Sequence, residues 1–274
     1  MDPSPLPDFD ALWNYDRPEE TEIALRQILP AAVRSKQAAY HAELLTQIAR
    51  AEGLQRKFER AHQSLDEAEA LLPPQPSRAR VRLLLERGRA FNSAGEPQAA
   101  RPLFLQAWEQ AQAIGEDALA VDAAHMMGIV EPPHEQLAWT HRALDLAERS
   151  TDPAASRWLG SLYNNLGWSH HSLGEYEHAL TLFEKALRWR EAHHQDEPAR
   201  IARWCVARCL RSLGRLPEAL GQQEGLLAEG QQAGRTDGFV LEEIAECLLA
   251  LDRAAQARPF FAQAAAELSR DAWL

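Results

Sequence analysis

Side chains that bind metal ions in other proteins occur close together at three places in the chain. They are two adjacent histidine pairs and one cysteine pair: His170 with His171, His193 with His194, and Cys205 with Cys209. Adjacent side chains on a helix point about 100° away from each other, so neither histidine pair can easily bind one ion. We therefore predict no metal site and no cofactor.

The sequence carries none of the common catalytic motifs. The phosphate-binding pattern GxxxxGK[ST], the zinc-protease pattern HExxH and the hydrolase pattern GxSxG are all absent. An acidic group, Glu242, Glu243 and Glu246, has the spacing of one helix face, where solvation is the commonest role. We therefore expect that the protein is not an enzyme.

The composition is that of an ordinary soluble protein. The 274 residues are 46% hydrophobic and carry a formal net charge of −11, which is unsuited to binding the phosphate backbone of nucleic acid. No apolar run reaches the about 18 residues of a membrane span, and the N-terminus is acidic where a secretory signal would be basic and then apolar. The three cysteines include no CxxC pair. We expect a cytoplasmic protein without nucleic-acid or membrane partners.

The chain repeats itself, and the clearest copy lies between Ser161 and Leu187. Two helical stripes flank a glycine suited to the left-handed end of a helix: Tyr163, Leu166, Gly167 and His170 before Gly174, and Ala179, Phe183 and Ala186 after it. This pattern resembles the tetratricopeptide repeat at nearly every signature position. Only His170 departs, because the family usually has tyrosine there.

The same template recovers five further copies. Their second helices contain Ala61, Leu65 and Ala68; Ala100, Phe104 and Ala107; Ala143 alone in the weakest copy; Ala219, Gln223 and Leu226; and Ala257, Phe261 and Ala264. The turn positions are Arg56, Gly95, Glu131, Gly174, Gly214 and Asp252, more widely spaced than the about 34 residues of the standard repeat. The wide spacing resembles the longer-period branch of the family, found in kinesin light chains and in peptide-sensing bacterial regulators.

The repeats predict an all-α fold, a right-handed α-solenoid of about six antiparallel helix pairs in which each pair packs only on its neighbours. Residues 21–32 precede them as an unpaired capping helix, which Pro30 should kink or end. We expect residues 1–15 to be extended or flexible and residues 16–274 to form a single domain. Cys209 and Cys247 fall at a small slot of the repeat, so we expect buried, reduced thiols without metal.

The resemblance implies a non-catalytic scaffold that binds a protein or peptide in the groove lined by the first helix of each pair. Related repeats often use an asparagine of that helix to bind peptide backbone, which implies this role for Asn164 or Asn165, with Asn165 favoured. The alternative function is a sensor that binds a small ligand or a signalling peptide and relays it to a partner protein.

Overlaying the first helices predicts further side chains that face a partner. The position after the signature glycine or alanine reads Arg50, Arg89, His125, Trp168, Arg208 and Glu246. Positions one helical turn away on the same face add Trp204, Arg211, Asn164 and His171. This set suits an acidic segment with an aromatic anchor. The alternative is that exposed positions of an arginine-rich chain are arginine by chance. Residues 8–16 of the chain itself, DFDALWNYD, have the chemistry of the expected partner, so this segment is a candidate occupant of the groove of its own or of a neighbouring molecule.

The last repeat is followed by only a few residues, so its apolar end lacks the capping helix that solenoids normally have. We predict a homodimer through this end, or a chain that folds back on it through Trp273.

Overall fold

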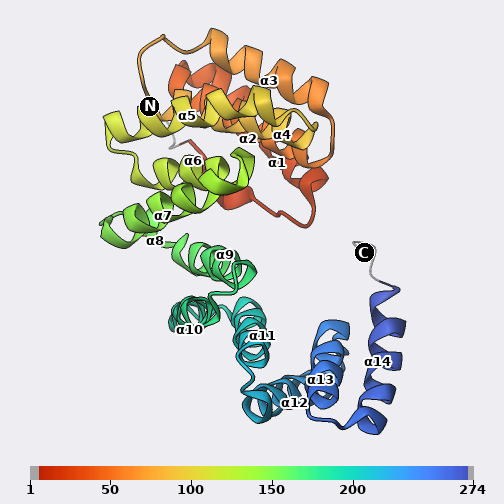
Figure 1. Ribbon diagram of the computed structural model, residues 1–274. Helices are drawn as coiled ribbons and strands as arrows, with labels where there is room; N and C mark the ends of the chain where they lie inside the picture. The colour runs from red at the N-terminus through yellow and green to blue at the C-terminus, as the bar shows by residue number, and fades with distance from the viewer. Residues whose placement is uncertain (1–5, 271–274) are drawn as a thin grey trace. The chain divides into compact units, whose positions relative to one another are not determined.

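The computed structural model describes residues 6–270, and every regular element in this range is a helix. The chain divides into two compact units, residues 1–157 and residues 158–274, a division that the repeat pattern alone does not mark. Each unit is described by itself, with the labels of Figure 1. Over the described range, none of the helices combines the length and the apolar character that crossing a membrane requires.

The N-terminal unit begins with a single turn of 3-10 helix and continues with α-helices. They are η1 (Asp10–Leu12), α1 (Pro18–Ser35), α2 (Ala38–Leu54), α3 (Phe58–Ala70), α4 (Arg78–Ser93), α5 (Pro97–Ile114), α6 (Asp117–Val130), α7 (Pro133–Arg149) and the short α8 (Pro153–Ser156). Helices α2 and α3, α4 and α5, and α6 and α7 pack as pairs, while α1 packs on α2.

The C-terminal unit continues the same pattern. Its helices are α9 (Leu159–Ser172), α10 (Tyr176–Ala192), α11 (Asp196–Ser212), α12 (Leu216–Gln232), α13 (Gly238–Ala250) and α14 (Ala254–Leu268). They pack as the pairs α9 with α10, α11 with α12, and α13 with α14. Six pairs preceded by α1 confirm the predicted α-solenoid. We call α2, α4, α6, α9, α11 and α13 the first helices, and their partners the second helices.

Most predicted turn residues have the left-handed backbone that ends a first helix. The φ angles are +88° at Gly95, +78° at Gly174, +74° at Gly214, +60° at Arg56 and +58° at Asp252. The exception is Glu131, whose φ is −74° and whose conformation is extended. A residue that precedes proline disfavours helical backbone, so Pro132 explains why this pair closes without a left-handed residue.

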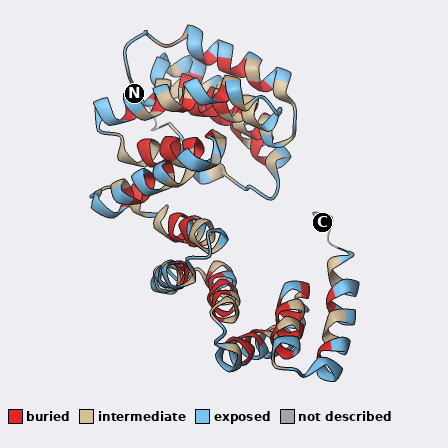
Figure 2. Cartoon of the chain, in the orientation of Figure 1, coloured by how far each residue is buried: buried red, intermediate tan, exposed pale blue. Residues whose placement is uncertain are grey.

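Each pair is held together by the predicted stripe of its second helix. Ala179, Phe183 and Ala186 are 0% exposed, and so are the corresponding residues of α3 and α5. Figure 2 shows buried residues recurring along the helices among intermediate and exposed ones. In the last pair Ala257 and Ala264 are buried, whereas Phe261 is only half-buried.

The capping helix α1 is longer than predicted. It runs through Pro30 and ends at Ser35, where Lys36 has a φ of +57°. Leu25 and Ala32, on either side of Pro30, are fully buried. Their packing keeps the helix continuous even though proline removes a backbone hydrogen bond. At the other end of the chain, Trp273 and the predicted dimer contact around it lie outside the described residues.

Candidate functional site

We call the residues after the signature glycine or alanine of the first helices, which were predicted to face a partner, the row. Its three arginines, Arg50, Arg89 and Arg208, are already paired within the chain. The Arg50 Nη1 lies 3.2 Å from the Glu86 Oε2, Arg89 donates to both oxygens of Asp122, and Arg208 donates to Glu243. In every case an arginine of one first helix reaches a carboxylate on the next first helix of the same unit. The row is therefore neutralised by the chain itself and does not form a free cationic stripe.

The carboxylates of these pairs are largely buried, which makes the pairs structural. The side chains of Glu86, Asp122 and Glu243 are 6%, 12% and 2% exposed. An ionised carboxylate is tolerated at such a place only when cations and hydrogen bonds compensate for the lost water. Sequence reasoning missed Glu86 and Asp122, and its expectation that Glu243 is solvated was wrong, because Arg208 and Arg211 hold this carboxylate in the interior.

Other polar residues of the predicted site belong to the same networks. Arg211 donates to both oxygens of Glu243 at 2.8 and 3.1 Å and approaches Glu246 at 3.7 Å. Burial lowers the pKa of His125, although the nearby Asp122 opposes this shift. Burial also lowers the pKa of His171, and the charge of Arg211 adds to the effect. The Nε2 of His171 lies 2.9 Å from the Oγ of Ser212.

The two predicted asparagines have different surroundings. The Cys205 thiol on α11 lies 3.4 Å from the Oδ1 of Asn164, so this side chain helps to join α9 to α11. Asn165, which the sequence analysis favoured, is exposed, and its backbone carbonyl oxygen accepts a hydrogen bond from the hydroxyl of Ser169. Asn165 is therefore the more accessible of the two amides.

The predicted tryptophans form a chain of rings across the first helices of the C-terminal unit. The Trp168 ring lies 6.0 Å from the ring of Trp204, which in turn lies 6.3 Å from Phe239 on α13. Trp168 also packs on Phe183, so its role is partly structural. Beside Trp204 there is a pocket of about 280 Å³, lined by Arg200, Ile201, Trp204, Asp237 and Phe239.

In the N-terminal unit, the chain's own segment of residues 7–15 lies on α2 and α4. The sequence predicted an extended or flexible stretch here, but residues 10–12 form η1 and Phe9 is only 7% exposed. Asp10 pairs with Arg82 of α4, and the indole of Trp13 donates to Gln47 of α2. Arg50, a predicted site residue, lies over the rings of Trp13 and Tyr15 at 5.9 and 5.7 Å.

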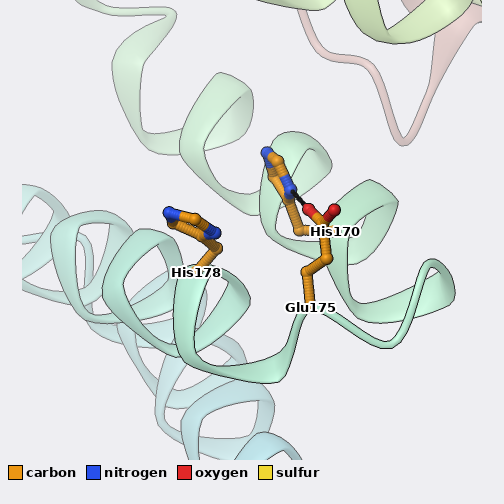
Figure 3. A group of neighbouring side chains, drawn as sticks. All are labelled: His170, Glu175 and His178. Carbon is orange, nitrogen blue, oxygen red and sulfur yellow. Dashed lines mark hydrogen bonds and ion pairs between the residues drawn. The ribbon is translucent and has the colours of Figure 1, made fainter.

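Figure 3 shows a cluster of His170, Glu175 and His178, a grouping that the sequence did not suggest. His170 lies in the last turn of α9, Glu175 directly precedes α10, and His178 lies in the first turn of α10. The His170 Nδ1 is 2.5 Å from the Glu175 Oε2, and the donor atoms of the three residues lie within 4.8 Å of one another. Tetrahedral zinc, with bonds of about 2.0–2.1 Å, needs donors only about 3.3 Å apart. The cluster is therefore a close contact between His170 and Glu175 beside a second histidine, and the three donor atoms would have to move closer together to bind an ion.

A family model agrees with the repeat deduced above. Residues 159–198 match the model of the tetratricopeptide repeat, which confirms the resemblance seen between Ser161 and Leu187. No curated protein sequence matches the chain.

Several solved structures share the fold. The apo form of RapI is 12% identical with a TM-score of 0.76, over 96% of this chain and 76% of RapI. PH0952 from Pyrococcus horikoshii, a signal transduction ATPase with a tetratricopeptide repeat sensor, is 14% identical with a TM-score of 0.72, over 91% of this chain and 39% of that protein. NprR in complex with its cognate peptide NprX is 16% identical with a TM-score of 0.55, over 96% of this chain and 76% of NprR. These structural similarities, at such low sequence identity, show a common fold and no more.

Proposed function

We propose that the protein is a non-catalytic scaffold that binds a segment of a partner protein on its first helices. The observation that carries this proposal is the exposed apolar pocket on α11 and α13. Ile201 and Phe239 are 51% and 41% exposed there, and the half-buried ring of Trp204 lies beside them. Exposed aromatic and aliphatic side chains around a pocket are typical of the anchor points of protein interfaces.

The size and the rim of the pocket favour a single anchoring side chain. Its volume of about 280 Å³ lies below the about 300–1,000 Å³ of typical small-molecule sites, which weighs against this pocket as a site for a metabolite. At the rim Arg200 Nη1 pairs with Asp237 Oδ2 at 2.7 Å, and the indole of Trp204 donates to the carbonyl of Phe239 at 3.3 Å. These polar groups are satisfied, so the free surface of the pocket is apolar.

The occupant we propose is a partner segment with an aromatic or large aliphatic residue. Counted in residues back from the turn residue of its own pair, Phe239 of α13 corresponds to Arg82 of α4. Ile201 of α11 corresponds in the same way to Glu43 of α2. In the N-terminal unit, Phe9 and Asp10 of the chain itself cover Arg82, the residue that corresponds to Phe239. Where that unit has Arg82 and Glu43, the C-terminal unit has apolar residues, so it should select an apolar anchor. The complex of NprR with a peptide supports binding of such a segment by this fold.

Peptide selection on the immobilised full chain tests this function. We expect the selected peptides to share an aromatic or large aliphatic residue and to lose more than tenfold in affinity on Phe239→Ala. Leu173→Ala is the control, because it removes an even more exposed apolar side chain, 62% against 41% for Phe239, just after α9 and outside the pocket. Equal affinity of the wild type and Phe239→Ala for every selected peptide, or a selection that yields none, would disprove the proposal.

A further inference from the structure

We propose that α2 and α4 form a second recognition site, for a segment with an aromatic–aspartate pair and another aromatic residue one turn later. Residues 7–15 of this chain are its built-in occupant, and a partner segment of the same pattern binds by displacing them. This inference rests on the proposed function, since it extends binding by the first helices to the N-terminal unit and names the chemistry of the ligand.

The aromatic–aspartate pair is read by Arg82 and Tyr40. Both guanidinium nitrogens Nη1 and Nη2 of Arg82 donate to the Asp10 carboxylate, at 3.0 and 2.7 Å, and the same guanidinium lies 5.5 Å from the centre of the Phe9 ring. The ring of Tyr40 is 5.3 Å from that of Phe9, and its hydroxyl donates to the carbonyl of Pro7 at 2.8 Å. A bidentate pair with a ring on the cation is selective for both residue types.

The second aromatic residue is read by Gln47 and Arg50. The indole Nε1 of Trp13 donates to the Oε1 of Gln47 at 3.0 Å, and Gln47 is only 6% exposed. Trp13 stacks on Tyr15 with ring centres 4.8 Å apart, and Arg50 lies over both rings. The single turn η1 separates Phe9 from Trp13, so both side chains reach the same pair of helices.

The segment docks as a ligand does, with Phe9 as its anchor in the core and most of its other side chains at the surface. Phe9 is its one buried residue, whereas Asp10, Asn14 and Tyr15 are exposed. Arg82 also differs from the arginines of the row. Each row arginine pairs with a carboxylate of the next first helix. Arg82 instead approaches Glu43 of the preceding first helix at 3.3 Å, and its bidentate partner comes from outside the helix pairs. A carboxylate from another molecule satisfies the same geometry.

Because residues 7–15 already occupy the site on α2 and α4, a partner segment must compete with them. The segment joins α1 almost directly, since Asn14 and Thr21 exchange two hydrogen bonds of 3.0 Å. A short connection gives the segment an effective concentration on the order of millimolar at its own site. A partner segment therefore binds weakly to the wild type and more tightly to a chain whose own segment no longer competes.

The probe for this site is a fluorescein-labelled synthetic peptide of residues 6–16, LPDFDALWNYD, titrated into the full chain by anisotropy. We expect the peptide to bind the Phe9→Ala/Trp13→Ala chain at least tenfold more tightly than the wild type. Adding Arg82→Gln to that chain should remove binding. Arg87→Gln should not, because Arg87 lies on the same helix but pairs with Asp66 and Glu69 of α3. Circular dichroism melts confirm that each chain is folded.

Since Phe9 is buried, Asp10→Asn/Trp13→Ala serves as a second released chain that keeps the core contact. No peptide binding to either folded released chain at several hundred micromolar overturns the proposal. Binding that Phe239→Ala removes and Arg82→Gln spares also overturns it, yet supports the pocket of the C-terminal unit. A wild-type dimer in light scattering that the substitutions dissolve would assign the site to the segment of a second copy, and so overturn occupancy within one chain. Failure of the peptide selection on the C-terminal pocket leaves this test unaffected.

Discussion

Gly167 of α9 lies directly against the ring of Phe183 of α10, so that a Cβ at Gly167 would come within 2.6 Å of the ring Cε1. The same relationship joins Gly88 to Phe104 in the N-terminal unit, at 2.4 Å. Both rings are 0% exposed, and neither can move without opening its helix pair. In these two pairs the glycine of the first helix is thus required by the large ring of the second helix.

We predict that Gly167→Ala destabilises the protein. Overpacking against Phe183 should cost about 1–3 kcal/mol, more than the about 1 kcal/mol that alanine gains over glycine in a helix. The control is Gly221→Ala in α12, where an added Cβ meets no atom within 4 Å and should stabilise by about 0.5–1 kcal/mol. Thermal melts of the two variants check the prediction, and it fails if both variants shift in the same direction.

A second prediction concerns the pair of Arg89 and Asp122. Replacing either residue with alanine leaves a partly buried charge with fewer partners, so each change should lower the free energy of unfolding by about 2 kcal/mol. The double variant should lose clearly less than the sum, because the two residues interact directly. Urea unfolding measures the cycle. The exposed pair of Arg17 and Glu20, with side chains 65% and 62% exposed, is the control and should show coupling below about 0.5 kcal/mol. Additive effects of Arg89→Ala and Asp122→Ala would contradict this prediction.

The carboxylate of Glu22 should make α1 docking sensitive to acid. Burial alone would raise the pKa of Glu22, but hydrogen bonds from Arg26, Gln55 and Lys57 outweigh it and lower the pKa from 4.5 to about 2. Because the folded value lies below the unfolded one, the stabilisation is complete above pH 4.5 and is lost as the pH falls towards 2. Its size is on the order of 2 kcal/mol.

Urea unfolding at neutral pH and near pH 3 tests the role of Glu22. Glu22→Gln should be less stable than the wild type at neutral pH and should lose less stability on acidification. Glu20→Gln, at an exposed neighbouring position, should keep the wild-type pH dependence. An unchanged loss in Glu22→Gln would show that other carboxylates cause the acid sensitivity.

The three cysteines should be unreactive in the folded protein. Burial raises the pKa of Cys205 to about 12 and the pKa values of Cys209 and Cys247 to about 11, against an ordinary value of 9.0. Since the thiolate is the reactive form, we expect labelling by a disulfide reagent at pH 8 to be more than 100-fold slower than in denaturant. In denaturant all three thiols should react. A fast-reacting thiol in the folded chain, or bound zinc by elemental analysis, would refute this expectation.

The helix pairs were predictable because their signal is local. A small residue, a large ring and another small residue recur on the second helices α5, α10 and α14, with looser versions on the others, and Gly95, Gly174 and Gly214 mark turns. The length of α1 was not predictable in this way. Its continuation through Pro30 depends on burial of Leu25 and Ala32 against α2, a tertiary contact that outweighs the local preference of proline.

The site was predicted only in part, because facing positions of different helices decide what is free. The row of Arg50, Arg89 and Arg208 was found by overlaying first helices, but the same overlay also aligns Glu86, Asp122 and Glu243 one turn earlier. Reading both rows together would have predicted the ion pairs. The acidic aromatic chemistry of residues 8–16 suggested that this segment occupies a groove, but its contacts with Tyr40, Gln47 and Arg82 depend on three-dimensional positions that no spacing in the sequence indicates.

The paired arginines also determine how fast a partner can arrive. Charges that cancel within a few ångströms project little field into solution, whereas the net charge of −11 acts over about 10 Å at moderate ionic strength. An acidic segment therefore meets repulsion during its approach and attraction only after contact with Arg82. The association rate of the acidic segment should rise with added salt, whereas the rate of an electrostatically steered encounter falls with salt. Residues 7–15 are tethered to their site and so do not cross this repulsive field.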